Sequence, residues 1–339
     1  MRRCKKCAPQ STPRSRLLLR YPMPPKRRKG RQVFVLEEPT STESDDAASV
    51  GTSAGEGSIV EDLAGDDDEH DADADAISQE DLEFRLSQHI DNMSDKNVKN
   101  RETALVLVQK LLTKKMFGDF LEGRRESLLH NIEFCFKKGR LSDVTLAAPV
   151  AALLCIQLGA GEESEEVLTV VRPLLCMFVQ DKHLPVTVRA NCADALALIT
   201  FIACEDIGLL SEVMVLMELL FTPNGSHSAD LQSHALVSWC LLLSILPARN
   251  FESVIDRILP VVVKLLSSSD VSLRIAAGEA VALLYELARG NDEDFEPEIE
   301  EELIEQLQSL ARDSSKYRSK KDKKQQRSCF RDVLRTVEV

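Results

Sequence analysis

The chain has 339 residues, of which 44% are hydrophobic and only 5% aromatic, so a sizeable core must be largely aliphatic. The formal net charge is −13 at pH 7, and no apolar run approaches the roughly 18 residues that a membrane span needs. The stretch "RLLLRYPMPP" has an apolar centre too short for a secretory signal peptide. We therefore expect a soluble protein, with one large or two ordinary domains and no membrane association.

The first 83 residues divide into a basic and an acidic segment. Residues 1–36 hold twelve Lys or Arg and no acid, whereas residues 37–83 hold eighteen Asp or Glu and no base. Both segments lack apolar periodicity, so we predict a disordered basic tail over 1–36 and a disordered acidic arm over 37–83. The arm is interpreted either as a segment that repels nucleic acid or masks a basic surface, or as one that serves only for solvation.

The basic tail contains one dense cluster of cations, in the stretch "PPKRRKGR" over 24–31. Such a cluster is typical of a nuclear localisation signal or of a loose contact with nucleic acid, and the alternative is a solubilising tail. The candidate residues for nuclear localisation are Lys26, Arg27, Arg28, Lys29 and Arg31.

Helical periodicity begins at residue 84, where five segments share one design: a patch of small residues followed by aliphatic ones. The segments are "NRETALVLVQKLL", "LAAPVAALLCIQLG", "VRANCADALALITFI", "LQSHALVSWCLLLSIL" and "LRIAAGEAVALLYEL". Their central alanines, 48, 43, 40 and 45 residues apart, are Ala104, Ala152, Ala195, Ala235 and Ala280. This period is that of HEAT and armadillo repeats, about 40–47 residues. We therefore predict an all-α, armadillo/HEAT-like α-solenoid over 84–310, preceded by the disordered N-terminal tails.

A second helix lies between each pair of these segments, as in "ESEEVLTVVRPLLCMFVQD", with apolar positions three and four residues apart. A lone hairpin cannot cover both faces, so we expect hairpins to stack into one continuous core, with the small-residue helix first in each unit. The small residues are interpreted as the places where a neighbouring helix approaches closely. Gly278 is the extreme case, because glycine inside a helix costs about 1 kcal/mol relative to alanine. Pro173 and Pro260 are expected to mark kinks or the first turns of divided helices.

Arginines open two of the small-residue helices. Arg189 and Arg274 each follow an aliphatic residue at the predicted helix start. Two interpretations are open: a solvated arginine of the first turn, or a structural arginine that donates to backbone carbonyls or to an acid of the adjacent unit.

No constellation in the sequence indicates catalysis. The six histidines are scattered, Gly159 and Gly161 form a GxG without a preceding strand, and the CxxC of Cys4 and Cys7 has no second pair. We therefore predict a protein that is not an enzyme, with no catalytic residue, cofactor, metal site or small-molecule substrate. Six of the nine cysteines are interpreted as reduced core thiols: Cys135, Cys155, Cys176, Cys192, Cys204 and Cys240.

The charge reverses near the C-terminus. Residues 291–311 hold nine acids and no base, whereas residues 312–339 hold ten Lys or Arg against four acids. On a helix over 320–337, cations gather on one flank and apolar residues on another. We predict that 311–339 forms a basic amphipathic helix that docks on the array and presents cations to phosphates, or alternatively a solvated capping helix. The candidate nucleic-acid or ribosome contacts are Lys320, Lys321, Lys323, Lys324, Arg327 and Arg331.

Several stretches resemble, in the same order, blocks of the interferon-related developmental regulator family. They include "LEGRRESLLHNIEFCFKKG", "LLCIQLGAGEESEEVL", "LRIAAGEAVALLYELARG" and "KKQQRSCFRDVLRTVE", and the resemblance extends from about 78 to 338. It implies an armadillo-like solenoid without catalytic activity, found in nucleus and cytoplasm. It also implies partners in transcriptional co-repressor complexes, including those that contain histone deacetylases, and ribosome binding as a brake on translation.

Family members continue into a further basic region, whereas this chain stops at Val339, so contacts made by that region are expected to be absent here. The leading interpretation is a non-catalytic helical-repeat scaffold that acts as a transcriptional co-regulator through protein–protein interactions. The alternative is a ribosome- or RNA-binding regulator of translation.

Overall fold

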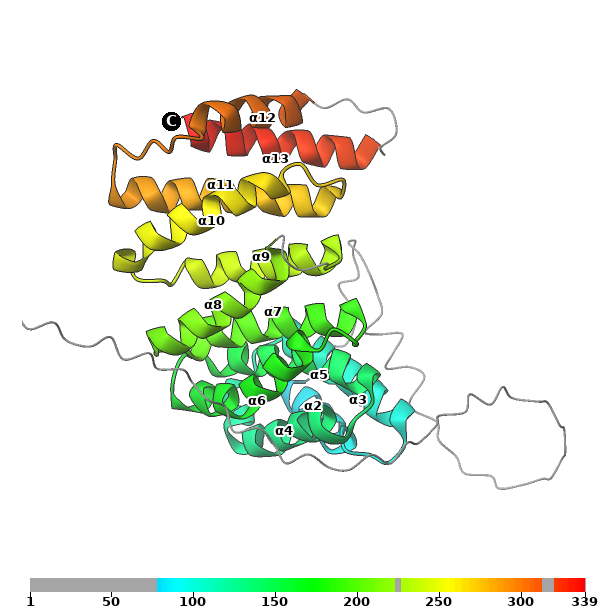
Figure 1. The fold of residues 1–339 in the computed structure, drawn as a ribbon. Helices are drawn as coiled ribbons and strands as arrows, with labels where there is room; N and C mark the ends of the chain where they lie inside the picture. The colour runs from blue at the N-terminus through cyan, green and yellow to red at the C-terminus, as the bar shows by residue number, and fades with distance from the viewer. Residues whose placement is uncertain (1–77, 223–226, 313–319, 339) are drawn as a thin grey trace, which may run out of the picture. The chain divides into compact units, whose positions relative to one another are not determined.

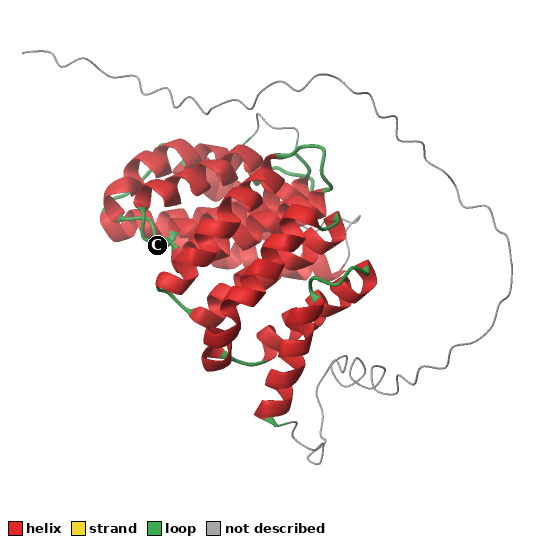
Figure 2. Cartoon of the chain, turned by 90° about the horizontal axis from the view of Figure 1, so that it is seen from below, coloured by secondary structure: helices red, strands yellow, loops and turns green. Residues whose placement is uncertain are grey.

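The computed structural model describes residues 78–222, 227–312 and 320–338. The basic tail, the localisation cluster within it and all but the last residues of the predicted acidic arm therefore lie outside the described residues. The described residues form α-helices and one short 3₁₀ helix joined by loops, and no strand occurs among them (Figure 2).

The first half of the described helices runs from α2 to α7 (Figure 1). Their bounds are α2 Gln79–Asn92, α3 Val98–Lys114, α4 Gly118–Lys138, α5 Leu141–Leu158, α6 Glu162–Gln180 and α7 Val186–Ala203. The second half comprises α8 Ile207–Phe221, α9 Ala229–Leu243, the 3₁₀ helix η1 Ala248–Asn250, α10 Phe251–Leu265, α11 Val271–Asn291, α12 Glu300–Arg312 and α13 Lys320–Glu338.

The helices alternate between two layers. The first layer is α3, α5, α7, α9, α11 and α13, each packed against the next, and the second layer, α2, α4, α6, α8, α10 and α12, packs on the first. The prediction of an all-α repeat architecture is confirmed. Each second-layer helix contacts the helix that follows it most extensively, so the small-residue helix closes each hairpin instead of opening it. A period sets the spacing of equivalent helices, but it does not say which neighbour each one pairs with.

The small-residue faces lie where first-layer helices approach one another. All five central alanines of the repeat are buried, and Ala276 and Ala277 of α11 are buried as well. A Cβ atom placed on Gly278 would lie 2.7 Å from Cε1 of Phe330 on α13. The close neighbour of this helix is therefore the C-terminal helix, and glycine is required at the point where the phenylalanine ring enters.

The C-terminal helix α13 is the last member of the first layer. Its apolar residues Phe330, Val333 and Val337 are buried against α11 and α12. Arg289 of α11 donates to the carbonyl oxygens of Thr336 and Val337, each at 2.9 Å, and so satisfies carbonyls that the helix end leaves unpaired. These contacts make α13 an integral part of the stack.

Hydrogen bonds between neighbouring units add specificity to the apolar packing. Nη2 of Arg101 on α3 lies 2.6 Å from Oδ2 of Asp143 on α5, whose side chain is fully buried. Glu218 of α8 accepts from Nε1 of Trp239 at 3.1 Å and from the guanidinium of Arg257 on α10. Each carboxylate therefore ties together helices that belong to different hairpins.

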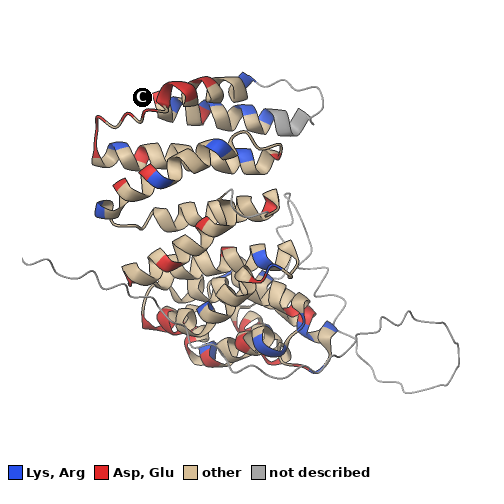
Figure 3. Ribbon diagram, viewed as in Figure 1, with Lys and Arg blue, Asp and Glu red and all other residues tan. Residues whose placement is uncertain are grey.

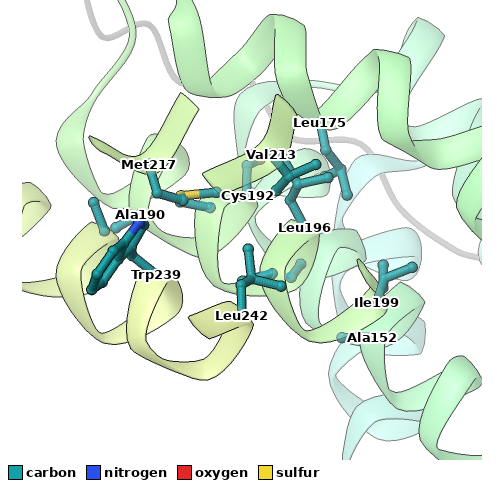
Figure 4. Close-up of a cluster of buried hydrophobic side chains, with 14 of the residues drawn as sticks. Ala152, Leu175, Ala190, Cys192, Leu196, Ile199, Val213, Met217, Trp239 and Leu242 are labelled. Atoms are coloured by element: carbon teal, nitrogen blue, oxygen red, sulfur yellow. The ribbon is translucent and has the colours of Figure 1, made fainter. Parts of the chain in front are cut away.

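The core between the layers is aliphatic, with the single tryptophan of the chain at one side (Figure 4). Cys192 lies inside it, and burial raises the pKa of this thiol to about 12, so it stays protonated at neutral pH. The cysteines of the described residues are all free, some buried and others at the edge of the core. They act as small apolar side chains.

Several expectations differ from the structure. Pro173 and Pro260 lie inside α6 and α10, so the expectation of divided helices is wrong, whereas the alternative of a kink stays a prediction. Helix α2 begins at Gln79, inside the segment assigned to the acidic arm, because Ser78 caps it by accepting from the backbone N–H of Asp81. The number of charged residues in a segment does not reveal a capping serine of this kind.

The expectation that no segment is apolar enough to cross a membrane is wrong by length and composition. Helices α5 and α7 both meet that criterion, with mean hydropathies of 1.8 and 1.5. More than half of each helix is buried inside the structure, 56% and 61% respectively. Helices that neighbours cover on several sides are apolar nearly all round, and this explains their composition.

Candidate functional site

Charged side chains concentrate at the C-terminal hairpin. Figure 3 shows α12 and α13 rich in acidic and basic residues, whereas α7 and α9 are largely uncharged. Helix α12 starts with three glutamates and ends with Arg312, an arrangement that complements the helix dipole.

A groove of about 500 Å³ between α12 and α13 gathers arginines and is named the basic groove. Its lining residues are Gln308, Ala311, Arg312, Arg327, Arg331, Leu334 and Glu338. Arg327 and Arg331 lie one turn apart on α13, and Arg312 comes from the last turn of α12. Guanidinium groups recognise phosphate and carboxylate through paired hydrogen bonds, so this groove suits an anionic ligand.

The structure brings together only part of the predicted phosphate-contact set. Arg327 and Arg331 line the basic groove, whereas Lys324 lines a separate hollow with Gln325 and Ser328. The backbone of Lys320, Lys321 and Lys323 belongs to α13, and their side chains lie outside the described residues. Sequence reasoning missed Arg312, which belongs to another helix, although it is the residue at which the charge reversal begins.

A second groove crosses the outer side of α9, α11 and α13 and is named the acidic groove. It consists of three adjoining hollows of about 590, 320 and 480 Å³, which share Glu279, Gln325, Cys329 and Asp332. Its apolar lining includes Val237, Ile275, Ala276, Ala282, Leu283 and Val333. Its carboxylates are those of Asp270, Glu279, Glu286 and Asp332.

Burial and neighbouring negative charges raise pKa values in the acidic groove. Partial burial raises the pKa of Glu279. Burial also raises the pKa of the Cys329 thiol to about 11, with further contributions from the negative charges of Glu279 and Asp332. The thiol therefore remains protonated at neutral pH and is not a nucleophile, since the thiolate is the reactive form.

The two predicted structural arginines are both buried and donate to backbone carbonyls. Nε of Arg189 donates to the carbonyl of Val179 at 3.0 Å, at the end of the preceding helix. Nη1 of Arg274 donates to the carbonyl of Ser268 at 2.6 Å, and Nη2 donates to Oε1 of Gln326 on α13 at 2.8 Å. Arg274 therefore connects the α10–α11 loop to the C-terminal helix.

One polar cluster contains serine, histidine and aspartate, but these residues are not arranged to activate the serine as a nucleophile. Asp194 of α7 lies 2.6 Å from Nδ1 of His234 and accepts from the hydroxyl of Ser238 at 3.0 Å. Because the serine donates to the carboxylate and not to the imidazole, no base is placed to activate it. In the described ranges, no three His, Cys, Asp or Glu side chains gather in a way that could hold a metal ion. The cluster connects α7 to α9.

The sequence matches the family model described as Interferon-related developmental regulator over residues 49–338. It is 40% identical over 272 residues to interferon-related developmental regulator 1 of Homo sapiens and 41% identical over 271 residues to interferon-related developmental regulator 2 of Mus musculus. Each alignment covers 77% of this chain, and the chain spans about 60% of the length of these relatives.

Among solved structures, the chain is similar to helical-repeat proteins. An engineered protein aligns with a TM-score of 0.52 at 15% identity, over 75% of this chain and 98% of that one. A designed armadillo repeat protein aligns with a TM-score of 0.50 at 15% identity, over 74% and 99% of the two chains. At such low identity the likeness shows the fold alone, and it agrees with the predicted armadillo/HEAT-like solenoid.

Proposed function

The chain belongs to the interferon-related developmental regulator family, and we propose from this that it is a non-catalytic scaffold that acts as a transcriptional co-regulator through protein–protein interactions. The partners in this proposal are proteins of transcriptional co-repressor complexes, and the places of action are the nucleus and the cytoplasm. Stacked hairpins of this kind offer extended surfaces for binding other proteins.

The observation that carries this proposal is a row of exposed apolar side chains on successive first-layer helices. Ile156 of α5 is 41% exposed, Phe201 of α7 is 36% exposed and Val237 of α9 is 52% exposed. Exposed apolar side chains that recur on neighbouring helices are typical of sites of protein interaction.

The test is co-precipitation of histone deacetylase activity with the full chain from cells, together with a transcription reporter. Ile156→Ser combined with Phe201→Ser is expected to reduce both signals strongly. The control is Val215→Ser combined with Leu219→Ser, which removes two exposed apolar residues of α8 in the other layer. Equal signals from the wild-type chain and the Ile156/Phe201 variant would contradict the proposal.

The second candidate, a ribosome- or RNA-binding regulator of translation, is favoured by the basic groove. Changing Arg312, Arg327 and Arg331 to Gln is expected to weaken binding to ribosomes or single-stranded RNA and to lower the salt dependence. The log–log slope is expected to fall by about 0.7 for each phosphate that the variant no longer neutralises. The control changes Lys99, Lys114 and Arg249 to Gln, which removes the same charge from exposed positions elsewhere. An unchanged slope in the groove variant would reject this candidate.

A further inference from the structure

The acidic groove is a series of adjoining hollows with partly apolar linings. The hollow between α9 and α11 joins the one between α11 and α13 at Glu279, and the latter joins the third hollow at Cys329 and Asp332. The section between α11 and α13 follows the two helices lengthwise, because α11 contributes Glu279 to Glu286 and α13 contributes Cys329 to Thr336. An extended segment therefore fits along it.

Two carboxylates of this groove differ from those at other junctions between helices. Glu166, Glu212 and Glu300 each pair with an arginine of another helix, at 3.1, 3.5 and 3.7 Å. Within the described part of the chain, Glu279 and Glu286 have neither an ion-pair nor a hydrogen-bond partner. Glu279 is also partly desolvated, which raises its pKa and makes its charge costly in the absence of a cation.

The other charged groups of the groove leave this section negative. Asp332 faces it from α13, and among the described residues it forms an ion pair only with the exposed Arg335 on its own helix, at 3.6 Å. Asp270 accepts from the backbone of Leu273 as the cap of α11. Lys324 lies in the third hollow, which does not include Glu286. A cationic ligand is therefore complementary to the section between α11 and α13.

We propose that the acidic groove binds an extended, Lys- or Arg-containing segment of a partner protein, with two cationic side chains placed on Glu279 and Glu286. These glutamates are seven residues apart on α11, which is about 10.5 Å along a helix. In the polyproline II conformation, residues i and i+3 are about 9 Å apart and point the same way. In a β-strand, residues on one face are about 7 or 13 Å apart, which fits less well.

This inference deepens the proposed protein-binding function and rests on it. The apolar floor of Ala282, Leu283 and Val333 suits the methylene stems of Lys and Arg and the rings of proline. Nucleic acid is the wrong class of ligand here, because its phosphates would meet Glu279, Glu286 and Asp332.

The experiment measures binding of a fluorescent peptide with a Lys-Pro-Pro-Lys core to the full chain by fluorescence anisotropy. Glu279→Gln combined with Glu286→Gln is expected to raise the Kd about tenfold. The matched control is Glu301→Gln combined with Glu305→Gln, which removes two exposed carboxylates from α12 and is expected to change the Kd by less than about twofold. A peptide with a Lys-Lys-Pro-Pro core is expected to bind more weakly than the Lys-Pro-Pro-Lys peptide.

Circular dichroism of both double variants checks that the helices are intact. Equal losses in the two variants would show general charge attraction and overturn the inference. Binding of an RNA oligonucleotide that Glu279→Gln weakens, or light scattering that shows a dimer abolished by Glu279→Gln, would overturn it too. Failure of this inference is distinguishable from failure of the proposed function, because Ile156 and Phe201, which test the latter, do not line this groove.

Discussion

Gly278→Ala tests the packing of α13 on α11. In an isolated helix the change is favourable by about 1 kcal/mol, because alanine has the higher helix propensity. Here the added methyl group would lie 2.7, 3.3 and 3.4 Å from Cε1, Cζ and Cδ1 of Phe330, whose ring is fully buried. Overpacking of this kind costs about 1–3 kcal/mol, so we expect a net loss of up to about 2 kcal/mol.

The location of the loss is as informative as its size. In a stack of repeats, stability is close to a sum of unit and nearest-neighbour terms, so the change is expected to act on the last hairpins. Hydrogen exchange is expected to become faster in α12 and α13 and to stay unchanged in α5. Emission from Trp239, the only tryptophan and fully buried on α9, serves as an internal control and is expected to stay unchanged in the folded state.

A double-mutant cycle separates overpacking from propensity. With Phe330→Leu in place, Gly278→Ala is expected to become neutral or stabilising, which gives a coupling energy of about 0.5–3 kcal/mol. If Gly278→Ala stabilised the chain by about 1 kcal/mol in both backgrounds, the ring would not lie over this glycine, and the reasoning about the small-residue face would be refuted.

Three further predictions concern a buried ion pair, a partly buried carboxylate and buried thiols. Arg101→Met is expected to lower the free energy of unfolding in urea by about 3–5 kcal/mol, because it leaves the carboxylate of Asp143 buried and without its arginine. Arg101→Met combined with Asp143→Leu is expected to lower it by less. The opposite order would contradict a stabilising role of this ion pair. Burial raises the pKa of Glu279 above its unfolded value, so stability is lost as pH rises through that pKa. Glu279→Gln is therefore expected to stabilise the chain at pH 7 and to have no effect near about pH 3, and a constant difference at both pH values would contradict the shift. Cys155 and Cys192 are fully buried with pKa values of about 12, so a thiol reagent at neutral pH is expected to label them only after unfolding, as mass spectrometry of peptides would show.

The repeat could be predicted from the sequence because its signal is local. Which side of a helix is covered decides where small residues such as Ala195 and Ala280 occur. The same holds for the apolar residues that recur at helical spacing. The helix over 320–337 was predictable for the same reason, and α13 spans Lys320–Glu338.

The contacts that position the candidate site were not predictable in this way. The pairs Arg101–Asp143 and Glu218–Arg257 join residues about forty positions apart, and Trp239 lies 21 positions from Glu218. The period alone does not say which side chains meet. The same holds for Arg312, which reaches the groove of Arg327 and Arg331 only because α12 folds back on α13. The acidic groove gave no signal in the sequence, because its walls come from three helices.

The position of α13 at one end of the first layer has a thermodynamic consequence. In the described part of the chain this helix is supported by α11 and α12, whereas an internal helix such as α7 is supported from both directions. A helix with fewer packed neighbours opens more readily than one that is covered from both directions. A ligand in the acidic groove would hold α13 on α11 and slow this opening, so its binding should be visible as protection of the C-terminal hairpin even when the rest of the molecule is unaffected.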